Sequence, residues 1–176
     1  YGKQSSDDLG YSLTTNGMKM LEDYDDTSLL ICQSGSLAKA LAGYAARFGE
    51  GYLQRSQEAV KCRDAAAWLA CCAMTGAAAE SVLLSVAIEK SGDEDAVVRD
   101  YRGASGRKKV LDRIVGSSPR HVREKLTTFT GIVSLWRDEA AHGRASPIST
   151  ANADEAMRQL LHMCQWVDSE WDRLTS

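Results

Sequence analysis

One stretch near the end of the chain places an arginine, an acid and a histidine within six residues. Arg137, Asp138 and His142 lie in the run WRDEAAHG. A histidine titrates near neutral pH and an arginine keeps a forked positive charge, so this pair can move a proton and hold a phosphate. Because Gly143 favours helix termination and Pro147 opposes continuation, we expect the helix that carries Arg137 to end at or near His142.

The spacing of the two basic residues favours a site shared between two subunits. Residues five apart on an ideal helix differ by about 140° around its axis. Arg137 and His142 would therefore flank a helix face without stacking on it. Two copies related by a two-fold axis would bring both pairs around one substrate, and we expect a homodimer.

A second block places one carboxylate in a long apolar run. Glu80 is the only charged residue between Ala65 and Ile88. Because a lone carboxylate is costly to bury unless it is paired, we expect Glu80 to pair with Arg137 or another basic residue and to position it. The run itself fits a helix that is buried on most sides in a soluble bundle better than a membrane span, because alanine and glycine dominate it.

Together these blocks resemble the HEPN superfamily, whose motif is an arginine, a polar residue and then a histidine after a gap of four to six. The gap here is four, the run from Gly76 to Leu84 resembles the early helix with its single glutamate, and the run from Arg107 to Gly116 resembles the basic connector helix. The resemblance covers roughly residues 56–176. Two details depart from the pattern: an aspartate stands where asparagine is commonest, and no tyrosine follows the histidine.

The resemblance implies an all-α helical bundle that cleaves RNA without a metal or other cofactor. It further implies a dimeric toxin or antiviral-defence ribonuclease, held inactive by an antitoxin partner or a regulatory domain. His142 would act as general base on a ribose 2′-hydroxyl, Arg137 would clamp the scissile phosphate, and Asp138 would hold the imidazole in one tautomer. The alternative for each is structural: a helix-terminal histidine beside free carbonyls, and an arginine and an acid that compensate each other.

Two competing functions remain open from the sequence. The domain is alternatively a non-catalytic dimerisation or nucleotide-binding module of a larger protein, in which Arg137 and His142 contact a nucleotide or the dimer interface. A plain helical scaffold without a small ligand is the third interpretation.

Charge is unevenly distributed along the chain. The formal net charge is -3, but residues 99–125 carry nine basic residues against three acids. This local +6 leaves -9 for the rest of the chain and would attract a phosphate backbone. We expect RNA to contact four basic residues in or near this segment: Arg107, Lys108, Lys109 and Arg144. The alternative is a solvated helix face of ordinary composition.

The cysteines and the other histidines argue against a metal site, and the cysteines also argue against a secreted protein. Five cysteines without zinc-binding spacing read as small buried residues of a reducing compartment. His121 and His162 read as surface or packing residues, because no second ligand stands at metal-binding spacing. With no signal peptide in the sequence, we expect a cytoplasmic protein that does not enter a membrane.

The apolar spacing predicts about four principal helices and several short ones. The sequence predicts a β-hairpin that turns at Asn16-Gly17, between residues 11–13 and 18–20. Helices are expected at residues 36–48, 56–90, 94–101, 107–115 and 119–142, and from Asn152, with Glu155 three residues later, onward. We divide the chain into an N-terminal extension at 1–55, with a regulatory role, and a HEPN-like bundle at 56–176.

Overall fold

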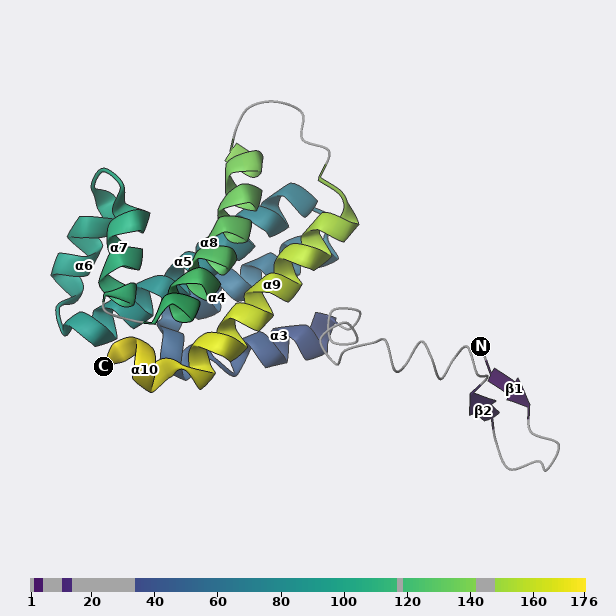
Figure 1. Cartoon of the computed structure of the whole chain (residues 1–176). Helices are drawn as coiled ribbons and strands as arrows, with labels where there is room; N and C mark the ends of the chain where they lie inside the picture. The colour runs from purple at the N-terminus through teal and green to yellow at the C-terminus, as the bar shows by residue number, and fades with distance from the viewer. Residues whose placement is uncertain (1, 5–10, 14–33, 117–118, 142–147) are drawn as a thin grey trace.

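The chain folds as an all-α helical bundle, seen in the computed structural model of Figure 1. The structure describes residues 2–4, 11–13, 34–116, 119–141 and 148–176, and the side chains of 34–116, 119–131 and 148–176. The helices are α3 (Ser34–Ala42), α4 (Ala45–Asp64), α5 (Trp68–Ser91), α6 (Glu94–Arg102), α7 (Gly106–Val115), α8 (Arg120–Ala141), α9 (Thr150–Ser169) and α10 (Trp171–Thr175).

Helix α5 is the centre of the bundle. Its apolar residues are spread around the helix axis, and α4, α6, α7, α8, α9 and α10 all contact it. Small residues such as Ala78 and Ala79 are buried on it and let neighbouring helices approach closely. It is the one described helix that is long and apolar enough to cross a membrane, yet 56% of its most apolar stretch is buried within the bundle. This is the pattern of a core helix.

The single long helix predicted at residues 56–90 is wrong, because the chain reverses in its middle. Helix α4 ends at Asp64, and α5 begins at Trp68 and packs back along α4. Ala66 takes the left-handed conformation, with φ 55°, and the backbone N–H of Ala67 donates to the carbonyl of Cys62 at 2.8 Å. Three alanines make this turn, so no glycine or proline marks it in the sequence.

The predicted ends of the short helices are confirmed. Gly92 ends α5 in the left-handed conformation, and the Asp93 carboxylate accepts a hydrogen bond from the backbone N–H of Ala96 at 2.9 Å to cap α6. Helix α7 stops before Gly116, whose φ is 35°. Helix α9 begins three residues earlier than expected, since Ser149, not Asn152, occupies the cap.

The core includes residues on both sides of the boundary that we predicted at residue 55. Leu37, Leu41 and Phe48 are buried in the same cluster as the residues of α5, α8 and α9. The Tyr52 hydroxyl, also buried, donates to the carbonyl of Leu41 at 3.1 Å and fastens α4 to α3. Helix α4 itself crosses residue 55, so residues 34–55 share their packing with the bundle.

A small antiparallel pair precedes the helices. Strand β1 (Gly2–Gln4) pairs with β2 (Tyr11–Leu13), with Lys3 opposite Ser12. One predicted strand, residues 11–13, is therefore present, but it pairs with residues 2–4. The predicted partner at 18–20 lies outside the described residues.

Helices α6 and α7 meet in close contact at Gly106. A Cβ atom on this buried residue would lie 1.8 Å from the carbonyl oxygen of Tyr101. Backbone atoms cannot move aside as the end of a flexible side chain can, so only glycine fits here. The close contact fixes the short turn between the two helices that carry most of the basic segment.

We expect Gly106→Ala to lower the free energy of unfolding by about 3 kcal/mol, because the new methyl group overpacks this contact. The matched control is Gly131→Ala in α8, where a Cβ would meet nothing within 4 Å. That change should raise stability by about 1 kcal/mol, since alanine is the better helix former. Urea unfolding followed by circular dichroism measures both, and equal effects would contradict the packing assigned to Gly106.

Candidate functional site: the C-terminal part of α8 and the groove beside α7

The predicted catalytic residues fall at the end of α8 and in the segment that follows. Arg137 and Asp138 lie within the last two turns of α8, which the structure describes to Ala141. Their backbone is described but their side chains are not, and His142 and Arg144 lie outside the described residues. The roles assigned to these four residues therefore stay predictions.

Helix geometry nevertheless gives the face of α8 on which Arg137 stands. Positions seven apart on an α-helix fall about 20° short of two full turns. Positions 123, 130 and 137 of α8 thus share one side of the helix, within about 40°. Along the axis, position 137 stands about 9 Å beyond Gly131.

Two described side chains on neighbouring helices bond to Glu80. The Tyr101 hydroxyl of α6 donates to its Oε2 at 2.5 Å, and Arg107 Nη2 of α7 donates to its Oε1 at 2.7 Å. The Glu80 side chain is 12% exposed and that of Arg107 29%. The sequence predicted a basic partner for Glu80, and Arg107 is one. Nothing in its spacing marked Tyr101 as a second partner.

The Glu80 network attaches both short helices to the central one. A second bond, from Arg113 Nη2 to Asp100 Oδ2 at 2.5 Å, joins α7 directly to α6. These bonds hold α6 and α7 as a unit against α5, with the basic residues of α7 at fixed positions. Arg107 consequently has a structural role beside the RNA contact predicted for it.

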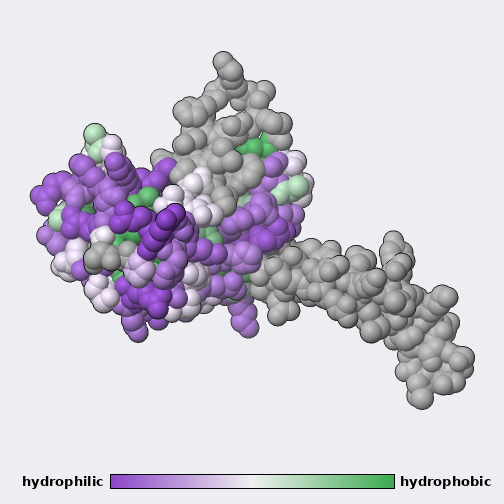
Figure 2. Space-filling model, viewed as in Figure 1, coloured by the Kyte–Doolittle hydropathy of each residue, from purple (hydrophilic) through white to green (hydrophobic). Residues whose placement is uncertain are grey.

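The basic segment divides into paired and unpaired cations. Arg107 pairs with Glu80, Arg113 with Asp100, and Arg120 with Glu124. Six others of the segment form no ion pair with a carboxylate among the described side chains: Arg99, Arg102, Lys108, Lys109, Arg123 and Lys125. In the view of Figure 2, hydrophilic residues cover most of the surface over α6 and α7.

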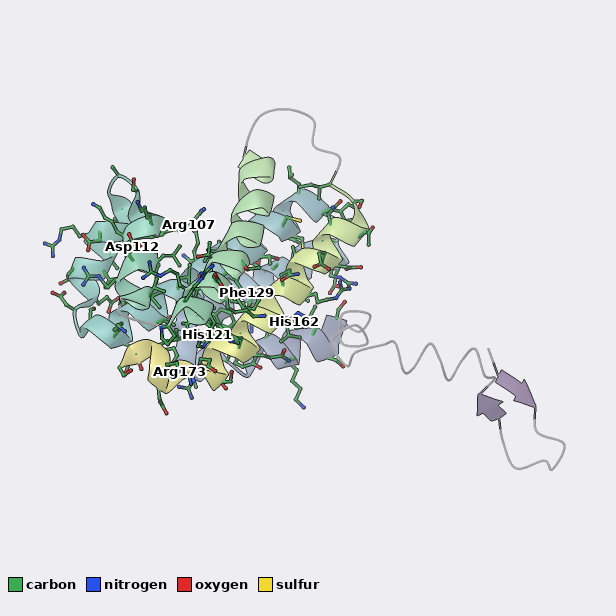
Figure 3. The ribbon with its side chains drawn as sticks, in the orientation of Figure 1. Arg107, Asp112, His121, Phe129, His162 and Arg173 are labelled. Carbon is green, nitrogen blue, oxygen red and sulfur yellow. The ribbon has the colours of Figure 1, made fainter. Side chains whose placement is uncertain are left out.

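A groove of about 470 Å³ separates α7 from α8. Lys108 and Arg123 line it from the two helices, and the Arg123 Nη2 donates to the carbonyl of Gly116 at 3.2 Å. Figure 3 shows Arg107 and Asp112 on α7, both of which also line the groove. Its other lining residues are apolar, hydroxylic or small: Leu111, Val115, Thr127, Thr130 and Gly131.

The two remaining lysines of this region lie away from that groove. Lys125 Nζ stands 5.0 Å from the ring centroid of Phe129, and both line a different groove between α8 and α9. His162 lines this second groove as well, close to Phe129 in Figure 3, whereas His121 is exposed. Lys109 is also exposed and does not line the α7/α8 groove.

The buried thiols are unsuited to nucleophilic chemistry. Burial raises the pKa of Cys71 to about 12, that of Cys72 to about 11 and that of Cys164 to about 12. These thiols stay protonated at neutral pH, while the thiolate is the reactive form. Among the described residues, no three histidine, cysteine, aspartate or glutamate side chains gather as a metal site would require.

Comparison with known proteins does not assign a family. None of the family models, curated proteins or solved structures with which the chain was compared matches it. The residues and their placement in the bundle are therefore the evidence for function.

We expect Tyr101→Phe to lower the free energy of unfolding by about 1.5 kcal/mol, because it removes a hydrogen bond to a charged acceptor. In a Glu80→Gln background the same change should cost much less, since the acceptor is then neutral. A double-mutant cycle measured by urea unfolding gives the coupling energy between the two residues. Additive effects would show that the Tyr101 hydroxyl does not stabilise α6 through Glu80.

Proposed function

We propose that this chain is a metal-independent endoribonuclease of the HEPN type, a cytoplasmic toxin or antiviral-defence effector that acts as a dimer. The observation that supports it best is the place of Arg137 on α8. Position 137 shares a helix face with positions 123 and 130, which line the cationic α7/α8 groove. A phosphate backbone held in that groove would run toward the Arg137 end of the helix.

The chemistry follows from the residue types. His142 accepts the proton of a ribose 2′-hydroxyl, and the 2′ oxygen attacks the adjacent phosphorus. The P–O5′ bond breaks, and the leaving 5′ oxygen takes a proton from the second copy of His142 or from water. The products are a 2′,3′-cyclic phosphate and a 5′-hydroxyl end. Arg137 offsets the negative charge that builds on the equatorial oxygens, and Asp138 orients the imidazole.

The purified chain should cleave end-labelled RNA in the presence of EDTA. Arg137→Ala and His142→Ala should each lower the rate at least about 100-fold, the usual scale for losing a general base or a charge clamp. Arg120→Ala is the matched control, because Arg120 is an exposed arginine of the same helix, paired only with Glu124 in the described structure. Mass spectrometry of the products should find the cyclic phosphate.

Equal cleavage by the wild type and by both variants would assign the activity to a contaminant. It would leave the non-catalytic dimerisation or nucleotide-binding module as the function. Cleavage that EDTA abolishes would instead contradict the metal-free mechanism.

The protein should also be a dimer in solution. By ideal helix geometry a single Arg137/His142 pair would flank a helix face without enclosing it, so we expect a complete site to need a second copy. Light scattering at the concentration of the cleavage assay should give about twice the chain's 19.2 kDa. A monomer that still cleaves RNA would rule out the shared site.

A further inference from the structure

We propose that the groove between α7 and α8 binds the sugar–phosphate backbone of single-stranded RNA, with Lys108 and Arg123 as the phosphate contacts. This assignment rests on the proposed function, and it replaces a general basic surface with one defined site. Of the four residues that the sequence suggested, the proposal retains Lys108, assigns Arg107 a mainly structural role and omits Lys109, while Arg144 lies outside the described residues. It adds Arg123.

The groove is lined by positive charge from both helices. Lys108 and Arg123 approach it from different helices, and neither forms an ion pair with a carboxylate among the described side chains. The charge of Arg107, by contrast, is already offset by Glu80. Lysines and arginines without a protein carboxylate gain most from a phosphate, because no existing ion pair is broken.

The apolar part of the groove favours a single strand. Leu111 and Val115 of α7 line the groove beside Lys108, and Leu111 is partly exposed. A groove of about 470 Å³ holds one or two nucleotides, whereas a duplex could place only part of one strand in it. A single strand can place a ribose or an unstacked base against Leu111, whereas a duplex keeps its bases paired inside.

The groove also holds one carboxylate, Asp112, which pairs with no cation among the described residues. A carboxylate repels phosphate, so its presence argues against a site built for a bare polyanion. It accepts hydrogen bonds, and the ribose 2′-hydroxyl is a donor that DNA lacks. Asp112 therefore favours RNA over single-stranded DNA.

The test measures binding rather than cleavage, in an Arg137→Ala background that keeps the RNA intact. A fluorescein-labelled oligouridylate of ten nucleotides is titrated with the full chain at several salt concentrations, and anisotropy is recorded. The groove variant is Lys108→Ala/Arg123→Ala. The matched control, Lys109→Ala/Lys125→Ala, removes one charge from each of the same two helices outside the groove.

We expect the groove variant to weaken binding about tenfold or more and to reduce the slope of log K against log salt by about 1.4, which corresponds to two phosphate contacts. The control should change affinity by less than about twofold. Equal losses in both variants would mean diffuse electrostatic attraction and would overturn the groove. Thermal unfolding checks that each variant folds, and Lys108→Ala alone repeats the test with one exposed residue.

Two further ligands test the chemistry of the site. The same sequence as deoxyoligonucleotide should bind more weakly, and Asp112→Ala should remove that difference. An RNA duplex should bind more weakly than the single strand, and tighter binding of the duplex would overturn the proposal. Groove-dependent binding without cleavage would refute the ribonuclease and support the groove as a binding site. Cleavage that Lys108→Ala/Arg123→Ala does not affect would support the ribonuclease and refute the groove.

Discussion

The paired carboxylate of Glu80 is the constraint on which the arrangement of the site depends. Helix α5 lies at the centre of the bundle, and a charge on such a helix is costly unless partners satisfy it. Tyr101 and Arg107 supply those partners from the two short helices, which also bury Val97, Val110 and Ile114 in the core. The largely buried Glu80 carboxylate thus acts together with this apolar packing to set where α6 and α7 dock, and with them the groove against α8.

Local signals were enough to predict most of the fold. Asp93 marks the start of one short helix and Gly116 the end of another. Capping acts within a few residues, so both helix ends can be predicted from the sequence. The reversal between α4 and α5 has no such signal. Its cost, a left-handed alanine at position 66, is offset by the packing of two long helices, which is a tertiary effect.

The candidate site likewise combines features that local sequence predicts with contacts that only the tertiary structure reveals. The motif residues and the excess of positive charge were visible in the sequence, as was the need of Glu80 for a basic partner. The identity of its partners was not, because Tyr101 and Arg107 lie 21 and 27 residues away. The sequence also gave no means of separating Lys108, which lines the groove, from its neighbour Lys109, which does not.

Among the described side chains, the division between paired and unpaired cations explains how a protein of negative net charge can present a locally cationic face. Three arginines of the basic segment form ion pairs, one of which docks α7 on α5 and another of which joins it to α6. The cations that form no ion pair with a described carboxylate are the ones that would attract a phosphate. Their effect is local, because salt screens exposed charges beyond roughly 10 Å. The net charge of -3 is therefore a poor guide to this surface. If the chain binds RNA as proposed, the acids elsewhere would repel the backbone of a long RNA and make the α7/α8 face its favoured approach.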